Sequence, residues 1–257
     1  MIQIKSAKEM ESMRRACMIS AAALRYGGQH IEAGMMTLEL DQLMYDFIIR
    51  QGAKPNFKGL YGFPGTACIS LNDTVIHGIP TKSQVIRPGD IVSIDVGAKV
   101  GGFNGDNACT FACGKIDMEA QRLLDVTKES LYLGIAAAKA GNRVGDIGHA
   151  VQQFCESHGF SVVREFTGHG VGKELHEDPE VPNYGTAGRG PRLVAGMTIA
   201  IEPMICQHDH KVKTLADGWT VKTRDGGLAA HFEHTVAILP GKTEILTKGW
   251  DEPDSLL

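Results

Sequence analysis

The sequence predicts an α/β (α+β) protein built from two similar halves, each of which runs from a pair of helices into a group of strands. Each pair of segments with helical apolar spacing is followed by short runs rich in β-forming residues. In addition, the runs 87–96 and 194–203 align, with glycine at the third position and an acid at the ninth in both. We therefore expect a pseudo-repeat, with halves of about 1–115 and 116–250, within one domain spanning 1–257.

The expected helices have local start and stop signals. Ser6 followed by Glu9 is a capping-box signature, and apolar residues continue from there at helical spacing to a pair of glycines. We expect Thr37 to cap the second helix, and further glycines to end it and the fourth. The predicted helices cover about 6–28, 37–52, 117–140 and 145–158.

The expected strands are apolar runs bounded by turn residues. A hairpin is also expected over 211–223, because Asp217–Gly218 is a favoured two-residue turn. The predicted strands are 66–71, 90–98 and 107–113 in the first half, and 160–166, 197–205 and 231–239 in the second.

Composition argues against several classes of protein. The chain is 43% hydrophobic and 22% charged with a formal charge of −4, so we expect neither sequence-specific nucleic-acid binding nor attachment to anionic membranes. Residues 1–17 contain no uninterrupted apolar core, which predicts neither a secretory signal nor a membrane span. The six scattered cysteines lack a CxxC pair, as is typical of a reduced, cytoplasmic protein. The last seven residues, 251–257, are expected to form a loose tail.

Two aspartates in the first half flank a predicted turn. Asp95 and Asp106 lie on either side of 100–102, and a carboxylate inside an apolar strand is costly to bury alone. If the turn centres between Val100 and Gly101, the two acids face each other directly; if it centres one residue later, they are diagonal neighbours on one face. Like charges so placed repel unless a divalent ion lies between them. The alternative is a solvated pair on an exposed face.

A matching pair of acids in the second half favours the metal interpretation. Glu202 and Glu233 lead into and out of the predicted hairpin, so they could be neighbours as well. His169, between glycines, could supply a nitrogen ligand or could be a loop residue. Four carboxylates balance two divalent ions, and oxygen-rich ligation with one imidazole suits manganese, iron(II), cobalt or zinc. Two such ions can activate a shared water and polarise a carbonyl or phosphoryl oxygen.

Other catalytic signatures are missing from the sequence. It contains no HExxH, because HEDPE at 176–180 lacks the second histidine, and no GxGxxG, GxxxxGK[ST] or GxSxG. This argues against the one-zinc peptidase helix, the simplest nucleotide-binding loops and the serine nucleophile elbow.

Several separated motifs, in one order, resemble those of the bacterial type I methionine aminopeptidases of the pita-bread metallopeptidase family. They are NDTVIHGIP (72–80), GDIVSIDV (89–96) with NGDNACTF (104–111), TGHGVGKELHEDP (167–179), GMTIAIEPM (196–204) and HFEHTV (231–236). The resemblance covers nearly the whole chain. It implies the pita-bread fold, in which a curved antiparallel sheet encloses a dinuclear metal site within a single catalytic domain.

The resemblance also implies a role for each ligand. Asp95 would bind one ion and His169 with Glu202 the other, while Asp106 and Glu233 would bridge them. The implied activity is removal of the initiator methionine from nascent proteins with a small second residue, by a hydroxide held on the two ions. Glu202 would also serve as the proton-shuttling partner of that water.

The same resemblance implies a set of substrate contacts. His77 would lie near the scissile nitrogen and His176 near the carbonyl oxygen or the next residue; from sequence alone, either could be an ordinary loop histidine. His231 stands where many relatives carry glutamine, and it could tune the site or add a ligand. The expected methionine pocket, for which ordinary core packing is the alternative, consists of Phe57, Leu60, Phe63, Cys68, Leu175 and Trp219.

Two other functions stay open at this point. One is an Xaa-Pro peptidase or creatinase-like enzyme, although such relatives usually carry an additional N-terminal domain. The other is a non-catalytic pita-bread protein that binds nascent chains, ribosomes or other partners. For the aminopeptidase we expect a monomer whose partners are nascent polypeptide N-termini, with the ribosome as one place to meet them, and no membrane.

Overall fold

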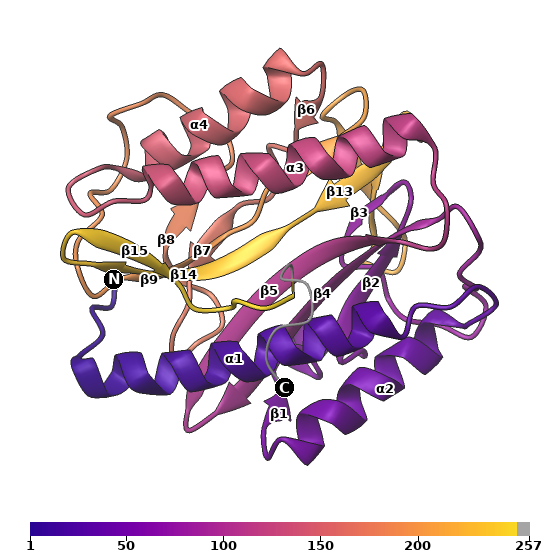
Figure 1. Cartoon of the computed structure of the whole chain (residues 1–257), viewed down its shortest axis with the longest axis horizontal. Coiled ribbons are helices and arrows are strands. Elements are labelled where there is room, and N and C mark those ends of the chain that lie inside the picture. Colours follow the sequence, from indigo (N-terminus) through magenta and orange to yellow (C-terminus); the bar gives the residue numbers. More distant parts are fainter. Residues whose placement is uncertain (251–257) are drawn as a thin grey trace.

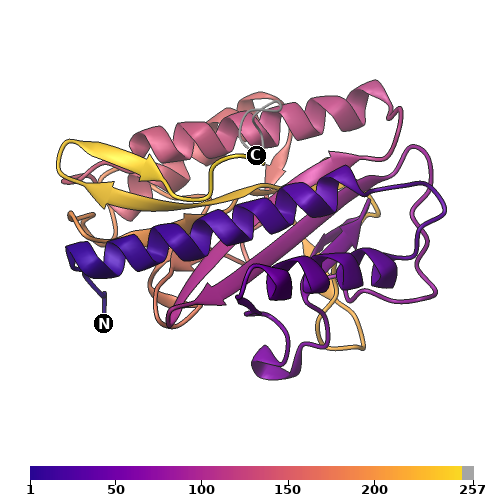
Figure 2. The same cartoon turned by 60° about the horizontal axis from the view of Figure 1, so that its bottom comes forward.

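The structure is a computed structural model that describes residues 1–250, so the predicted tail at 251–257 lies outside the described residues. Four helices lie in two pairs over a curved antiparallel sheet (Figures 1 and 2). The first pair is α1 with α2, and the second is α3 with α4. Their bounds are α1 Ala7–Gln29, α2 Thr37–Arg50, α3 Met118–Ala137 and α4 Val144–Ser157, and a short 3₁₀ helix covers Leu60–Gly62.

The main sheet has nine strands, all joined antiparallel, in the order β1-β4-β5-β14-β9-β7-β8, with β2 beside β4 and β15 beside β14. Two small sheets, β13-β10-β6 and β11-β12-β3, adjoin it. The strands are β1 Lys54–Pro55, β2 Ala67–Leu71, β3 Thr74–Ile76, β4 Ile91–Val100, β5 Phe103–Ala112, β6 Ser161–Val162, β7 Gly168–Gly170, β8 Glu177–Val181, β9 Thr198–Ile201, β10 Met204–Cys206, β11 Val212–Thr214, β12 Val221–Thr223, β13 Ala229–His231, β14 Glu233–Leu239 and β15 Lys242–Ile245.

All four predicted helices are confirmed, and so is the capping box at Ser6 and Glu9. The predicted cap at Thr37 is wrong. Met36 is the N-cap of α2, and its backbone N–H is satisfied by the Glu39 carboxylate at 2.8 Å. The hydroxyl of Thr37 instead accepts a hydrogen bond from the Thr81 N–H at 2.9 Å and donates to the Thr81 carbonyl at 3.2 Å, so it fastens a distant loop to the helix.

Three predicted strands differ from the structure. The run 160–166 is reduced to the two residues of β6. The run 197–205 divides into β9 and β10, which belong to different sheets, and 231–239 divides in the same way into β13 and β14. The two breaks, at Glu202–Pro203 and at Phe232, lie beside each other on neighbouring strands. Proline has no N–H to donate to a ladder, which helps to explain the first break.

Strand alternation decides which side chains face the helices and which face away from them. A Cβ placed on Gly105 of β5 would lie 2.5 Å from the Ala16 carbonyl oxygen of α1, so the backbones of helix and strand touch there. The next residue, Asp106, therefore points to the opposite face of the sheet. In the second half Ile201 packs towards α3, and Glu202 points away from it.

A buried aspartate joins the two layers in the first half. Asp41 of α2 accepts hydrogen bonds from the backbone N–H groups of Thr66 at 2.7 Å and Ala67 at 2.9 Å, where β2 begins. We expect Asp41→Ala to lower the free energy of unfolding by about 2–4 kcal/mol, because it leaves two buried N–H groups unpaired. Asp41→Asn keeps the accepting oxygen and should lose much less. Urea unfolding measures both, and equal losses would contradict this role.

Candidate metal centre

The β4–β5 hairpin places the first pair of acids. Val100 pairs with Phe103, and both glycines of the turn, Gly101 and Gly102, have positive φ (61° and 85°), as a type I′ two-residue hairpin turn requires. Of the two registers left open by the sequence, the later one is therefore correct. Asp95 lies opposite Ala108 and Asp106 opposite Gly97, which makes the two acids diagonal neighbours.

The second pair of acids lies where two strand pairings meet. β9 and β14 pair Ile201 with His234, and β10 and β13 pair Met204 with His231. Both pairings have the same register, so Glu202 and Glu233 lie opposite each other in the gap between them. The same register continues through β11 and β12 to the predicted turn at Asp217–Gly218.

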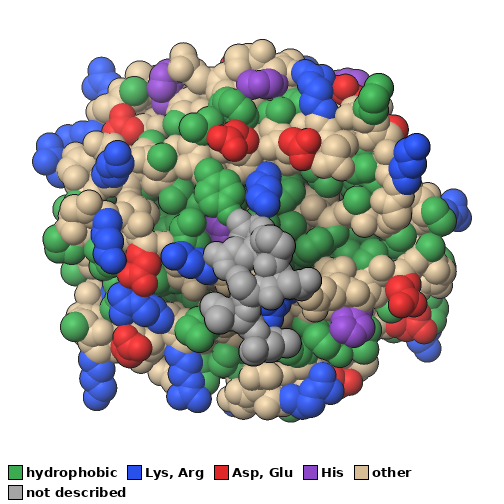
Figure 3. Space-filling view, in the orientation of Figure 1, with side chains coloured by type: hydrophobic (Ala, Val, Ile, Leu, Met, Phe, Trp, Pro, Cys, Tyr) green, Lys and Arg blue, Asp and Glu red, His purple; other side chains and the backbone are tan. Residues whose placement is uncertain are grey.

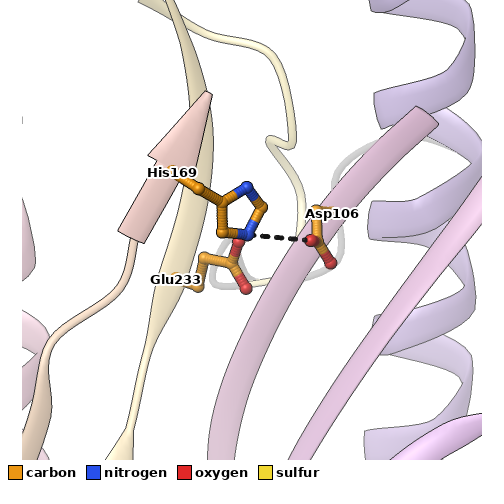
Figure 4. A group of neighbouring side chains, drawn as sticks. All are labelled: Asp106, His169 and Glu233. Atoms are coloured by element: carbon orange, nitrogen blue, oxygen red, sulfur yellow. Dashed lines mark ion pairs between the residues drawn. The ribbon is translucent and has the colours of Figure 1, made fainter. Parts of the chain in front are cut away.

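His169 on β7 faces both acid pairs. Its Nδ1 donates to the Gly170 carbonyl at 2.8 Å, which leaves Nε2 with a lone pair. Nε2 lies 3.5 Å from Glu202 Oε1 and 3.7 Å from Asp106 Oδ2. Figure 4 shows His169, Asp106 and Glu233 converging from three different strands, and their ligand atoms lie within 4.8 Å of one another.

Burial and mutual repulsion disfavour ionisation of these carboxyl groups. Burial raises the pKa of Glu202 to about 8, and burial with Glu202 nearby, partly opposed by His231, raises that of Asp95 to about 7. Burial and the neighbouring acids hold the pKa values of Asp106 and Glu233 well above their usual range. Burial lowers the pKa of His169 to about 3, so its imidazole is neutral and able to bind a cation.

The unpartnered atoms of the site fit a divalent metal. Within residues 1–250, the buried oxygens Asp95 Oδ1, Asp106 Oδ1 and Glu233 Oε1 have no hydrogen-bond partner. An unpaired buried carboxylate oxygen is costly, and a cation is the simplest group that satisfies several at once. Four carboxylates with one neutral imidazole form an oxygen-rich set suited to manganese, iron(II), cobalt or zinc.

A cavity of about 860 Å³ opens over these acids, and every predicted ligand and substrate contact lines it, whereas His231 is not among its lining residues. The ring of His176 lies 4.4 Å from that of His169. His77 has a left-handed backbone (φ 58°) and contacts Phe166 and Trp219 edge-on, at 5.7 and 6.1 Å between ring centres. Burial is the main cause that lowers the pKa of His77 to about 4, with smaller contributions from two neighbouring histidines.

The predicted pocket residues form one apolar cluster beside the acids. Phe57, Phe63, Cys68 and Leu175 are buried, and Leu60, Trp219 and one unpredicted residue, Ile79, pack against them. Sequence reasoning also missed Phe166 and Tyr61, which line the same cavity. Ile79 belongs to the motif NDTVIHGIP (72–80), so the sequence could have indicated it as a pocket residue. No sequence signal indicated Tyr61. Its backbone is left-handed (φ 50°), and its exposed ring stacks over that of His176 with 6.2 Å between ring centres.

Residues 11–240 match the sequence model of metallopeptidase family M24. The chain belongs to this family. A methionine aminopeptidase from Clostridium perfringens is 52% identical over 247 residues, covering 96% of this chain and 99% of that protein. Methionine aminopeptidase 1 from Bacillus subtilis is 50% identical over 248 residues, covering 96% of this chain and all of that protein (100%). The recognition of the methionine aminopeptidase family from its motifs is therefore confirmed.

Solved structures of M24 members confirm the predicted pita-bread fold. A methionine aminopeptidase from Thermotoga maritima superposes with a TM-score of 0.95 at 45% identity, over 97% of this chain and 100% of that one. A prolidase from Pyrococcus furiosus gives a TM-score of 0.79 at 25% identity, over 96% of this chain but 65% of the prolidase. This chain therefore shares its fold with both a methionine aminopeptidase and a prolidase.

The raised carboxyl pKa values predict how metal binding depends on pH. Without metal, Asp95 and Glu202 hold protons in the folded state up to pH values near 7 and 8, against ordinary values of 3.8 and 4.5. They therefore lower the stability of the metal-free protein as pH rises through this window. A divalent ion displaces those protons, so its stabilising effect should grow over the same window.

Thermal unfolding with EDTA or with excess Mn²⁺, at about pH 5 and about pH 7.5, measures this effect. We expect a larger metal-induced rise in melting temperature at the higher pH, and a weaker pH dependence in Glu202→Gln. An equal rise at both pH values would contradict the assignment of these acids as ligands.

Proposed function

We propose that this chain is a single-domain, metal-dependent aminopeptidase that removes the N-terminal methionine of polypeptides with a small second residue. The observation that carries the proposal is a cross-strand pair: Cys68 of the apolar cluster lies directly opposite Asp95 of the metal centre. A side chain seated in the pocket would therefore place its own backbone over the carboxylates. The names of the close relatives support the same conclusion.

The metal centre would hold two divalent ions. Asp106 and Glu233 would hold both ions, Asp95 would hold one of them, and His169 with Glu202 would hold the other. When bound, such ions supply Lewis acidity, which activates water and polarises a peptide carbonyl. Manganese, iron(II), cobalt and zinc all suit this ligand set.

The side chains around the ions would orient the substrate and move protons. Glu202 would also take up and return a proton of the attacking water, since its carboxylate lines the cavity beside His169. Neutral His77 and His176 line the cavity, where they can hydrogen-bond to the scissile nitrogen and to the carbonyl oxygen or the next residue. Aromatic walls such as Phe63 and Trp219, which meet edge-on at 5.1 Å, suit the polarisable sulfur of methionine.

We infer a cytoplasmic monomer that meets nascent polypeptide N-termini, at the ribosome among other places. Lys and Arg side chains are interspersed with Asp and Glu on the helical face in Figure 3, and no gathering of one sign stands out there. No helix within residues 1–250 is long and apolar enough to cross a membrane.

Peptide hydrolysis separates the candidate functions. With each metal restored in turn to metal-stripped protein, we expect Met-Ala-Ser to be cleaved and Ala-Pro peptides to resist, because the apolar pocket selects the first side chain. Glu202→Gln, which cannot accept a proton, should lower kcat by about 10²–10⁴-fold. Cleavage of Ala-Pro peptides alone would favour the Xaa-Pro peptidase. No cleavage with any metal would favour a non-catalytic binding protein.

Removal of a pocket wall should weaken methionine recognition without unfolding the protein. Trp219 lies between β11 and β12 and contacts both Phe63 and His77. We expect Trp219→Ala to lower kcat/KM for Met-Ala-Ser by about 10–100-fold, as the loss of 1–3 kcal/mol of side-chain recognition implies. Leu215→Ala, on the same ribbon but outside the cavity lining, is the matched control. Equal kinetics in the two variants would argue against the pocket.

A further inference from the structure

His231 is a buried histidine at the metal centre that the proposed mechanism does not use. It ends β13, two residues before Glu233, and is 1% exposed. Its Nε2 has no hydrogen-bond partner among the described residues. The atom is nevertheless aimed at the site, because it lies 3.6 Å from Glu202 Oε2. A buried ring nitrogen without a hydrogen-bond partner is costly, so its position beside Glu202 needs a physical explanation.

The backbone of His231 is held in place by a pair of buried hydroxyls. Its N–H donates to Thr110 Oγ1 at 2.9 Å, and the same hydroxyl donates to the His231 carbonyl at 2.9 Å. Because that donation uses the only hydroxyl proton of Thr110, Ser93 Oγ must be the donor in the 2.7 Å contact between the two hydroxyls. Cross-strand pairing with Met204 adds a further constraint. The ring is therefore carried on a rigid element, as a positioning group requires.

Each oxygen of the Glu202 carboxylate lies near a different imidazole. Oε1 is 3.5 Å from Nε2 of His169, whose lone pair faces the site. Oε2 is 3.6 Å from Nε2 of His231. An N–H donor at Oε2 would fix the rotation of the carboxylate and keep Oε1 on the same side as the His169 lone pair.

We propose that His231 is a positioning residue that donates its Nε2–H to Glu202 Oε2 and so orients Oε1 towards the ion shared with His169. The present separation is a few tenths of an ångström longer than a hydrogen bond, and a small rotation of either side chain closes it. Hydrogen bonds to metal ligands pre-orient them, and their loss typically costs about 10–100-fold in metal affinity. The inference rests on the metal-dependent activity proposed above.

Two substitutions of similar size separate donation from packing. His231→Gln keeps an N–H donor, whereas His231→Leu fills the space without one. We expect His231→Leu to weaken Mn²⁺ binding by about 10–100-fold in the step that fills the position held by Glu202 and His169. His231→Gln should restore binding to within about threefold of the unaltered protein. His208→Ala, which removes an exposed imidazole, is the control for surface metal binding, and melting temperatures without metal verify folding.

Pulsed EPR of the Mn²⁺-loaded protein gives a readout independent of affinity and activity. We expect one coordinated imidazole, that of His169, in the unaltered protein and in both variants. Two coordinated imidazoles in the unaltered protein would make His231 a ligand and overturn the proposal. If the unaltered protein binds Mn²⁺ and cleaves Met-Ala-Ser while His231→Leu binds the ion equally well, only this inference fails. If the unaltered protein binds no ion, the proposed function fails with it.

Discussion

The structure depends on bringing four carboxylates into one small buried volume. The ionised form of each is less stable in the protein interior than in water. Burial together with mutual repulsion therefore raises the pKa values of these acids, which are Asp95, Asp106, Glu202 and Glu233. Among the ion pairs of residues 1–250, only histidines approach these acids. The arrangement is therefore costly without a bound cation, and only a rigid scaffold can maintain it.

The sheet provides that rigidity by using its two faces differently. The helices pack on one face, and α1 lies so close to it that no side chain would fit at Gly105. Strict alternation then sends the neighbouring acids to the other face, where the cavity opens. Asp95 and Asp106 share one continuous hairpin, whereas Glu202 and Glu233 lie opposite each other in a gap between two pairings of equal register. Glu233 also begins the pairing of β14 with β5, so β14 brings this second pair of acids beside the hairpin that carries the first.

The two halves contribute corresponding acids, whereas both histidines paired with those acids come from the second half. His169 lies beside both Glu202 and Asp106, and His231 lies beside Glu202. The apolar cluster is built from five segments: the loop that carries Phe57 and Phe63, strand β2, the loop with Ile79, the loop with Leu175 and the hairpin with Trp219. The same fold occurs in a methionine aminopeptidase and in a prolidase.

Local sequence determined much of this protein. The capping box at Ser6, the glycine turn after β4 and apolar periodicity predicted the helices and the central hairpin, because those signals act between residues a few positions apart. The motifs identified the ligand candidates. Only the tertiary structure decided which turn register holds, where the strands at Glu202 and Phe232 break, why Thr37 is not a cap, and what His231 faces. Each of these depends on a partner more than 20 positions away or on strand pairing, and local propensity carries no information about either.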